Sequence, residues 1–282
     1  MSEFQITDWD DAYANAAHIP DGHRWPDAWI EPAARYRANT RCELDIAYGD
    51  GERQVYDLFL PDAEAAGLLV FVHGGYWLDF DKSYWSHLAK GAVDSGWAAA
   101  IPSYVLCPHA SIGDICRMIA AAIRHAADRI PGPIVLTGHS AGGHLASFMV
   151  CDGSPLAFDV RQRVVHTVSI SGLHDLRPLL KTKINCQLRL TDSDAMQLSP
   201  ALRLPDPHCR LTAWVGQAER PEFIRQSELI ANIWRGLGAW TQCAVAPRQH
   251  HFDVIDGLCD AQSTLMKAAL ANLPFAPPDI QA

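Results

Sequence analysis

The sequence contains no apolar run long enough to cross a membrane. Its longest apolar runs, such as residues 67–72 and 97–101, have the length of β-strands, whereas a membrane-spanning helix needs about 20 apolar residues. Residues 1–13 are acidic and include no apolar stretch, which is unlike a secretory signal peptide. We therefore expect a cytoplasmic protein with no membrane partner.

Positive charge is also scarce. Lys and Arg number 23 against 32 Asp and Glu, which gives a formal net charge of −9 at pH 7. A nucleic-acid-binding protein would need a basic face, so we expect a small-molecule partner and no nucleic acid. The length predicts one domain over residues 1–282, with residues 1–40 as an extension that packs on it near the mouth of its pocket. A homodimer stays open.

Paired cysteine and metal-binding motifs are absent. The eight cysteines are scattered and form no C-x-x-C pair. We interpret them as reduced, mostly buried thiols, with a disulfide framework as the lesser alternative. The histidines do not show the H-E-x-x-H spacing of a zinc site, and no glycine-rich nucleotide motif occurs. We therefore expect no metal and no cofactor.

Strand and helix patterns alternate along the chain. Residues 42–47 and 54–60 flank a glycine-rich turn, which predicts an antiparallel hairpin. The later alternation favours an α/β protein with a mostly parallel central sheet and helices on both faces. Residues 8–17 are compatible with a short helix, and the prolines in residues 18–32 predict an irregular segment. The remaining expected strands are 67–73, 97–103, 134–137, 164–171, 211–216 and 240–245, and the expected helices are 83–95, 112–127, 141–151, 221–237 and 261–273.

One stretch has the pattern of a nucleophilic serine. Residues 134–146 read IVLTGHSAGGHLA, so an apolar strand leads through G-x-S-x-G into a helix of small residues. This is the context of the nucleophile elbow in the α/β-hydrolase fold. Small neighbours permit the tight turn, which presents the Ser140 hydroxyl at a helix N-terminus. We predict Ser140 as the nucleophile, with a chance glycine-rich turn as the alternative.

A second glycine-rich loop lies earlier in the chain. Residues 68–77 read LLVFVHGGYW, in which His73, Gly74 and Gly75 follow an apolar strand. Glycine lets the backbone approach a substrate carbonyl closely and donate hydrogen bonds to it. We predict an oxyanion hole formed by the N–H groups of Gly74 or Gly75 and of Ala141, and a structural role for His73.

The base and the acid must follow the serine in the order acid, then histidine. Two adjacent histidines, His250 and His251, come after the last expected strand, and position alone leaves both open. The acid should follow the strand 211–216. Glu219 is the predicted acid, and Glu222 is the alternative, although a carboxylate in a first helical turn is already explained by the helix dipole.

Together these motifs resemble the kynurenine formamidase (arylformamidase) branch of the α/β-hydrolase serine esterases. The matching segments are HGGYW at 73–77, GHSAGGHLA at 138–146, GQAERPEFIRQS at 216–227 and HFD at 251–253, supported by DAY at 11–13 and YDLFLP at 56–61. The resemblance covers most of the chain and implies His251 as the general base. It departs at one point, because the branch usually has Asp where this chain has Glu219.

The resemblance implies hydrolysis of N-formyl-L-kynurenine to kynurenine and formate, a step of tryptophan catabolism. A general carboxylesterase or thioesterase for small acyl esters is the alternative, since one site can attack amide, ester and thioester carbonyls. Tyr76, Trp77 and Phe252 are expected to form an aromatic wall for the substrate. The alternative for each of these three is ordinary packing.

Overall fold

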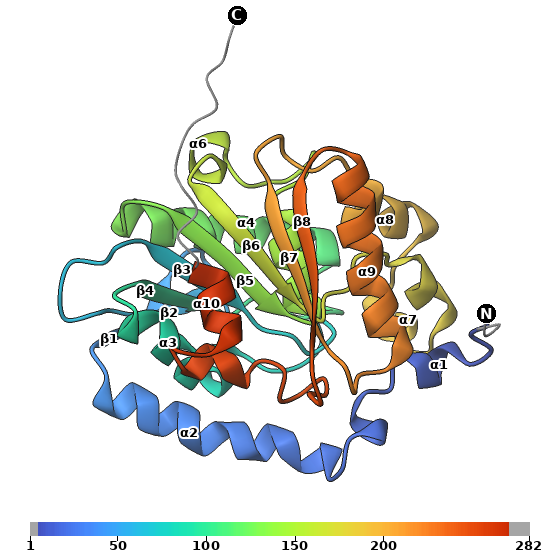
Figure 1. The fold of residues 1–282 in the computed structure, drawn as a ribbon, viewed down its shortest axis with the longest axis horizontal. Coiled ribbons are helices and arrows are strands. Elements are labelled where there is room, and N and C mark those ends of the chain that lie inside the picture. Colours follow the sequence, from blue (N-terminus) through green and yellow to red (C-terminus); the bar gives the residue numbers. More distant parts are fainter. Residues whose placement is uncertain (1–4, 271–282) are drawn as a thin grey trace, which may run out of the picture.

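Eight strands form one sheet in the computed structural model, which describes residues 5–270 (Figure 1). They are β1 (Cys42–Ala47), β2 (Val55–Phe59), β3 (Leu68–Val72), β4 (Ala98–Pro102), β5 (Ile134–His139), β6 (Val164–Ile170), β7 (Arg210–Gly216) and β8 (Trp240–Ala246). The strand order is β1-β2-β4-β3-β5-β6-β7-β8. The β1–β2 and β2–β4 pairs are antiparallel and the other pairs are parallel. The predicted mostly parallel sheet with an N-terminal hairpin is therefore confirmed.

Helices connect the strands and surround the sheet. The α-helices are α1 (Trp9–Ala12), α2 (Trp25–Asn39), α3 (Lys90–Asp94), α4 (Ile112–Arg129), α5 (Ala141–Phe148), α6 (Phe158–Arg161), α7 (Asn185–Leu188), α8 (Asp192–Gln197), α9 (Pro221–Gly236) and α10 (Thr264–Leu270). Short 3₁₀ helices are η1 (Ala16–His18), η2 (Gly22–Arg24), η3 (Lys82–Tyr84), η4 (Ser86–Ala89), η5 (Arg177–Lys181), η6 (Pro200–Leu202) and η7 (Asp256–Cys259).

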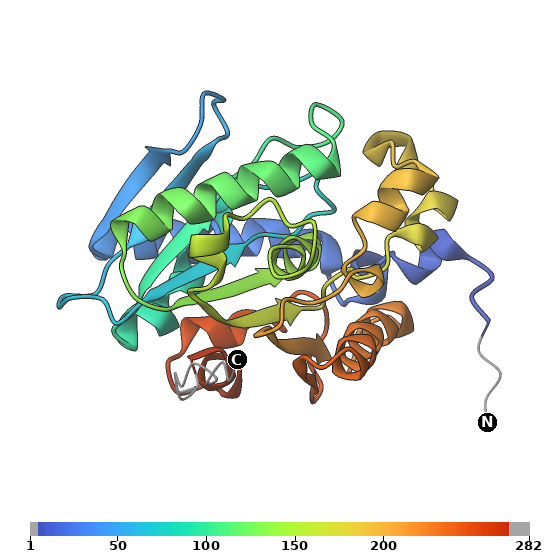
Figure 2. The ribbon, with the colours of Figure 1, turned by 90° about the horizontal axis from the view of Figure 1, so that it is seen from above.

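Both faces of the sheet are covered, which explains the unbroken apolar strands. In β3, Leu68, Val70 and Val72 belong to one apolar cluster, whereas Leu69 and Phe71 belong to another. Successive side chains of a strand point to opposite faces, so a strand buried on both sides must be apolar throughout. The first cluster includes residues of α4, α5 and α9, and the second includes residues of α2, α3 and α10. Figure 2 shows α4 and α10 on opposite sides of the sheet.

The prediction of an irregular segment over residues 18–32 is wrong in its second half. The 15-residue helix α2 begins at Trp25 and contains Pro32. Pro26 lies in its first turn, where the missing N–H costs nothing. Pro32 removes one internal hydrogen bond. The burial of Trp29 and Ala33 offsets this loss, and the Trp29 ring lies 4.5 Å from that of Trp85.

Other element boundaries also differ from the predictions. The helix expected at 83–95 is divided into η3, η4 and α3, and the one expected at 8–17 into α1 and η1. The closing helix expected at 261–273 is present as α10 over Thr264–Leu270, and positions 271–273 lie outside the described residues. Local backbone hydrogen bonds, which a hydropathy pattern does not reveal, set these ends.

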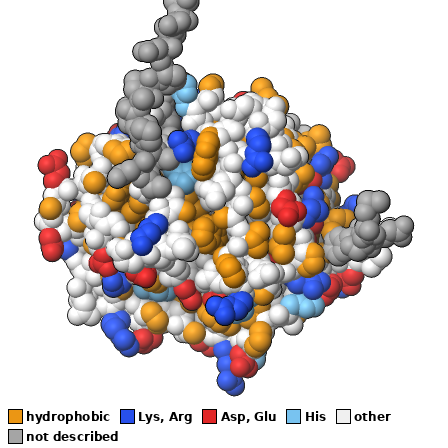
Figure 3. Space-filling view, viewed as in Figure 1, with side chains coloured by type: hydrophobic (Ala, Val, Ile, Leu, Met, Phe, Trp, Pro, Cys, Tyr) orange, Lys and Arg blue, Asp and Glu red, His pale blue; other side chains and the backbone are white. Residues whose placement is uncertain are grey.

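The surface charges, the helix lengths and the cysteines describe the outer properties of the molecule. On the face shown in Figure 3, basic and acidic side chains are interspersed. Within residues 5–270, no helix has both the length and the apolar character needed to span a bilayer. All eight cysteines lie in this range and none is disulfide-bonded. Four of them are buried, three are partly buried and Cys186 is exposed, so the prediction of mostly buried thiols holds for half of them.

Candidate active site

Ser140 occupies a sharp turn between β5 and α5. Its backbone has φ 56° and ψ −117°, a conformation that non-glycine residues rarely adopt. The turn requires glycine at position 138, because a Cβ there would lie 2.2 Å from Gly142 O. The Ser140 N–H donates to Ile170 O of β6 at 2.8 Å. The serine is therefore held in a strained conformation at the N-terminus of α5, which is the geometry of a nucleophile elbow.

The glycine loop after β3 lies directly against this turn. A Cβ at Gly74 would lie 3.0 Å from Ser140 Cβ and 2.8 Å from His139 O, so only glycine permits this close approach. His73 is buried, and its Nδ1–H donates to Gly74 O at 2.8 Å. Its ring stacks on Tyr104 with centroids 4.4 Å apart. These contacts give His73 the structural place that the sequence suggested.

The other two predicted donors border the same turn. Ala141 is the first residue of α5 and is fully buried. Gly75 O accepts hydrogen bonds from Leu78 N at 2.9 Å and Asp79 N at 3.0 Å, which close the glycine loop into a turn. The backbone of this loop and the first turn of α5 thus meet around Ser140.

The histidine and the acid are in direct contact. His251 Nδ1 lies 2.6 Å from Glu219 Oε2, and both side chains are buried. Gly216 N donates to the other carboxylate oxygen, Oε1, at 2.8 Å. The Ser171 hydroxyl donates to Oε1 as well. With one oxygen held by two donors, the carboxylate is fixed with its second oxygen aimed at the imidazole, which orients the ring.

His139 links the elbow to the histidine. Its Nε2–H donates to His251 O at 2.8 Å, and the two rings lie 4.5 Å apart. Burial lowers the pKa of His139 well below its ordinary value, and the neighbouring His251 lowers it further, so His139 is a neutral hydrogen-bond donor. Within residues 5–270, no hydrogen bond joins the Ser140 hydroxyl directly to the His251 imidazole. The two residues are instead linked through His139, which precedes Ser140 and donates to the backbone carbonyl of His251.

The structure separates the two pairs of candidates that position alone left open. The Nδ1 atom of His250 accepts from Phe252 N at 3.2 Å and from Asp253 N at 3.3 Å, so this side chain caps a turn. Glu222 is buried, but it accepts from the Tyr13 hydroxyl at 2.8 Å and pairs with Arg225. Of the two carboxylates, Glu219 is the one that contacts His251.

The three aromatic residues expected around the substrate lie in different places. Trp77 is fully buried and its ring packs against His144 with centroids 5.1 Å apart, so its contacts are those of a core residue. The Tyr76 hydroxyl donates to Tyr13 O at 2.6 Å. Phe252 is partly exposed, and its ring lies 5.9 Å from that of His251.

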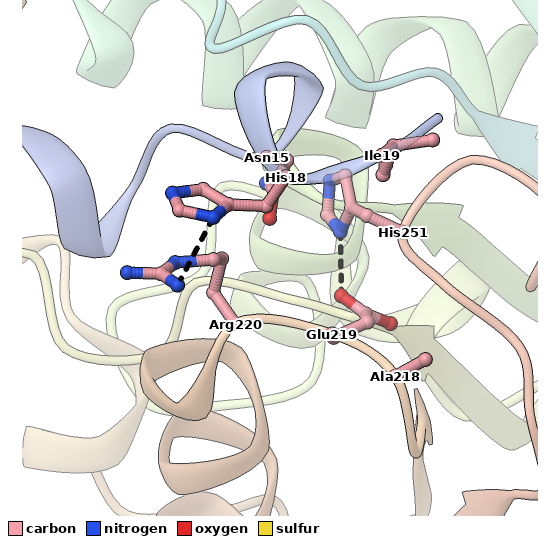
Figure 4. Close-up of a pocket in the computed structure, with 7 residues that line it drawn as sticks. All are labelled: Asn15, His18, Ile19, Ala218, Glu219, Arg220 and His251. Carbon is pink, nitrogen blue, oxygen red and sulfur yellow. Dashed lines mark hydrogen bonds and ion pairs between the residues drawn. The ribbon is translucent and has the colours of Figure 1, made fainter. Parts of the chain in front are cut away.

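A small pocket adjoins the histidine (Figure 4). Its lining comes from the N-terminal segment and from the loops after β7 and β8: Asn15, His18, Ile19, Ala218, Glu219, Arg220 and His251. Sequence reasoning did not name Asn15, His18, Ile19 or Arg220 as site residues, nor Ser171 beside Glu219. No motif contains them, because only the fold brings the N-terminal segment to this place. Among the described residues, no cluster of His, Cys, Asp or Glu is arranged to hold a metal ion.

Known proteins share this sequence and arrangement. Residues 56–193 match the BD-FAE family. Kynurenine formamidase of Danio rerio is 30% identical over 248 residues, which cover 84% of this chain and 83% of that protein. The crystal structure of a putative thioesterase from Silicibacter sp. TM1040 has 44% identity and a TM-score of 0.88, and covers 93% of this chain and 98% of its own. A Pyrobaculum calidifontis esterase, with 18% identity, a TM-score of 0.67 and coverage of 93% and 95%, shows the same α/β-hydrolase fold.

Proposed function

Because the chain belongs to the kynurenine formamidase family and is a hydrolase of the arylformamidase or small-acyl esterase type, we propose that it hydrolyses N-formyl-L-kynurenine to kynurenine and formate. The observation that carries this proposal is the buried Glu219–His251 pair beside the strained Ser140 turn. We assign Ser140 as nucleophile, His251 as general base and Glu219 as the acid that orients the base.

The first half of the reaction forms a formyl-enzyme. With Nδ1 of His251 engaged by Glu219, Nε2 is the nitrogen free to accept the Ser140 proton. Ser140 Oγ bonds to the formyl carbon, and the carbonyl electron pair moves to oxygen. The N–H groups of Ala141 and of Gly74 or Gly75 stabilise this oxyanion, each worth about 3–4 kcal/mol by analogy with measured oxyanion holes. Collapse breaks the C–N bond, and the imidazolium protonates the leaving aromatic amine.

The second half releases formate. A water molecule gives its proton to His251 Nε2 while its oxygen attacks the formyl carbon. The tetrahedral intermediate collapses, the C–Oγ bond breaks and the imidazolium returns the proton to Ser140. The Glu219 carboxylate stabilises the imidazolium in both halves without itself being protonated. No step needs a metal or an organic cofactor.

Hydrolysis of small acyl esters is the second candidate. It is supported by the names of two structural neighbours, a putative thioesterase and an esterase. The catalytic residues are the same for both candidates, so the substrate must separate them. A cytoplasmic location, action as a single domain and self-association into a homodimer belong to the proposal as well. Cell fractionation, limited proteolysis and light scattering of the purified protein test these three in turn.

Side-by-side turnover decides between the two candidates. We expect kcat/KM for N-formyl-L-kynurenine to exceed that for p-nitrophenyl acetate. Efficient ester turnover with an untouched formamide would remove the arylformamidase assignment and leave the esterase.

A serine variant tests the mechanism separately. Ser140→Ala should lower kcat by about 10⁴-fold or more and abolish labelling by a fluorophosphonate. Ser147→Ala is the matched control, because Ser147 lies in α5, the helix that follows Ser140, and its hydroxyl donates to Gly143 O. A labelled Ser140→Ala protein would contradict the assignment.

A further inference from the structure

Asn15 carries an amide whose hydrogen bonds are unfulfilled. Its side chain is only 6% exposed and lines the pocket beside His251. Neither Oδ1 nor Nδ2 has a hydrogen-bond partner within the described chain. A buried amide without partners destabilises a fold by about 1–3 kcal/mol, and buried polar groups are otherwise almost always bonded. The lining of this pocket therefore contains a side-chain amide, Nδ2–H2 and Oδ1, whose hydrogen bonds are unsatisfied within the described chain.

The surrounding chain holds this amide in place. Asn15 N donates to Tyr13 O at 3.0 Å. The same carbonyl accepts from the Tyr76 hydroxyl at 2.6 Å, and the Tyr13 hydroxyl reaches Glu222 of α9 at 2.8 Å. Asn15 thus lies two positions after Tyr13, whose carbonyl and hydroxyl are both hydrogen-bonded to the main domain, and these contacts fix this part of the N-terminal segment.

A positive charge lies at the same pocket. Arg220 also lines it and is paired with Asp11, and one of its terminal nitrogens lies 3.4 Å from His18 Nδ1 (Figure 4). Asp11 in turn contacts His18 Nε2 at 2.7 Å, and this contact, before the Arg220 charge, lowers the pKa of the Asp11 carboxyl. The guanidinium is held in place at the pocket, and its buried Nε has no partner within residues 5–270.

The position of His251 indicates which part of a substrate meets these groups. One imidazole accepts the serine proton and then delivers it to the leaving atom, so the leaving group must lie on the side of His251. The pocket is lined by His251 and Glu219 and not by Ser140. A leaving group that extends past His251 into this pocket would meet Asn15 and Arg220.

We propose that Asn15 and Arg220 form a specificity site for a carboxylate on the leaving group of the substrate. The Arg220 guanidinium supplies the charge, and Asn15 Nδ2–H donates to the carboxylate or to a carbonyl on the path to it. A guanidinium binds carboxylates in a directional way. The inference rests on the proposed function, in that Ser140 and His251 define the leaving side. Kynurenine, an aromatic amine with an amino-acid side chain, has the chemistry that this site would select.

Matched substrates test the site. We would compare 4-(2-formamidophenyl)-4-oxobutanoate, which carries the carboxylate, with neutral 2-formamidoacetophenone, and likewise the acetyl esters of the two corresponding phenols. The wild-type protein should favour the carboxylate member of a pair by about 10-fold or more in kcat/KM. In Arg220→Gln the ratio should fall to within about 3-fold of unity, because KM for the carboxylate substrate rises. The kinetics with the neutral substrate should be nearly unaffected.

Three further variants complete the design. Asn15→Leu replaces the polar amide with an apolar side chain of similar size, and Asn15→Asp places a negative charge at the pocket. Both variants should lower the preference for the carboxylate substrate over the neutral one. Arg117→Gln is the control, because Arg117 is likewise paired with an aspartate, Asp114, but lies on α4. Its ratio should equal that of the wild type.

Every outcome bears on the inference. Equal losses for charged and neutral substrates would mean that Asn15 and Arg220 only support the fold, and a wild-type ratio that Arg220→Gln leaves unchanged would overturn the site. The ester pair keeps the two proposals apart. If neither formamide is hydrolysed, the proposed function fails. The ratio of kcat/KM between the carboxylate ester and the neutral ester, measured in the wild type and in the variants, still supports or rejects the carboxylate site.

Discussion

Glu219 Oε2 lies 2.6 Å from His251 Nδ1, although the two residues are 32 positions apart in the sequence and on different loops. Both loops follow parallel strands, β7 and β8, whose carboxyl ends meet at one edge of the sheet. Active sites of open α/β sheets lie at this edge. The contact therefore follows from the topology of the sheet, and it can be probed by substitution.

Glu219→Gln should lower kcat by about 10²–10⁴-fold, because the amide orients the imidazole without stabilising its charged form. We expect the melting temperature to change little, since the shape of the side chain is retained. Steady-state kinetics measure kcat, and calorimetry on the same preparation measures the melting temperature.

Glu222→Gln supplies the matched control. Glu222 accepts from Tyr13 and pairs with Arg225 away from the imidazole, so this variant should lose stability while keeping most of its kcat. A Glu222 variant as inactive as the Glu219 variant would show that the acid has been assigned to the wrong residue.

Ser171→Ala should lower kcat by about 5–10-fold and leave KM within about twofold. The hydroxyl of Ser171 helps to hold Glu219 Oε1, and a misplaced orienting group costs rate more than binding. Ser169→Ala is the comparison, because Ser169 lies two positions earlier, on β6, and contacts His174 at 3.3 Å instead. Equal kinetics of the two variants would count against a positioning role for Ser171.

Tyr13→Phe should destabilise the fold by about 1–3 kcal/mol, because it leaves the buried Glu222 carboxylate without one of its donors. Urea unfolding followed by tryptophan fluorescence measures the change. Tyr84→Phe is the control, since the Tyr84 hydroxyl has no hydrogen bond within the described chain, and it should shift the free energy of unfolding by less than about 0.5 kcal/mol. The prediction fails if the two variants are equally stable.

The free energy of unfolding should fall as the pH drops from about 6.5 towards 4. Burial lowers the pKa of His73, His144 and His166 to about 4 and that of His174 to about 3, from 6.5. Between these values the unfolded chain binds protons that the folded chain does not, so acid favours unfolding. Asp256 opposes this by one proton, because burial raises its pKa from 3.8 to about 6.

Urea titrations at pH 7, 6 and 5 measure this dependence. His166→Gln should reduce the slope of stability against pH by about one proton, or about 1.4 kcal/mol per pH unit. A free energy of unfolding that stays constant between pH 7 and pH 5 would contradict the prediction.

The sequence was informative wherever chemistry is confined to a short motif. The elbow around Ser140 is local, since its glycines and its strand–helix context lie within a few residues. The choice between His250 and His251 needed a family resemblance, because both follow the last strand. Their hydrogen bonds to Asp253 N and to Glu219 distinguish them only once the loop has folded.

Other parts of the site could not be predicted in the same way. Asn15 and Arg220 come from segments 205 positions apart, and nothing in either segment marks it as part of a pocket. The prolines of residues 18–32 predict an irregular segment and hide the helix α2, in which Pro26 lies in the first turn and the burial of Trp29 compensates for Pro32. Tertiary packing outweighed a local preference there.

The second position of the G-x-S-x-G motif accepts any residue, but in this chain it is His139, which donates a hydrogen bond to the backbone of His251. We expect a substitution at position 139 to disturb the placement of His251, the proposed general base. Substitutions at position 139 are therefore a way to vary the placement of the His251 imidazole, and with it the turnover rate, in directed evolution of this enzyme.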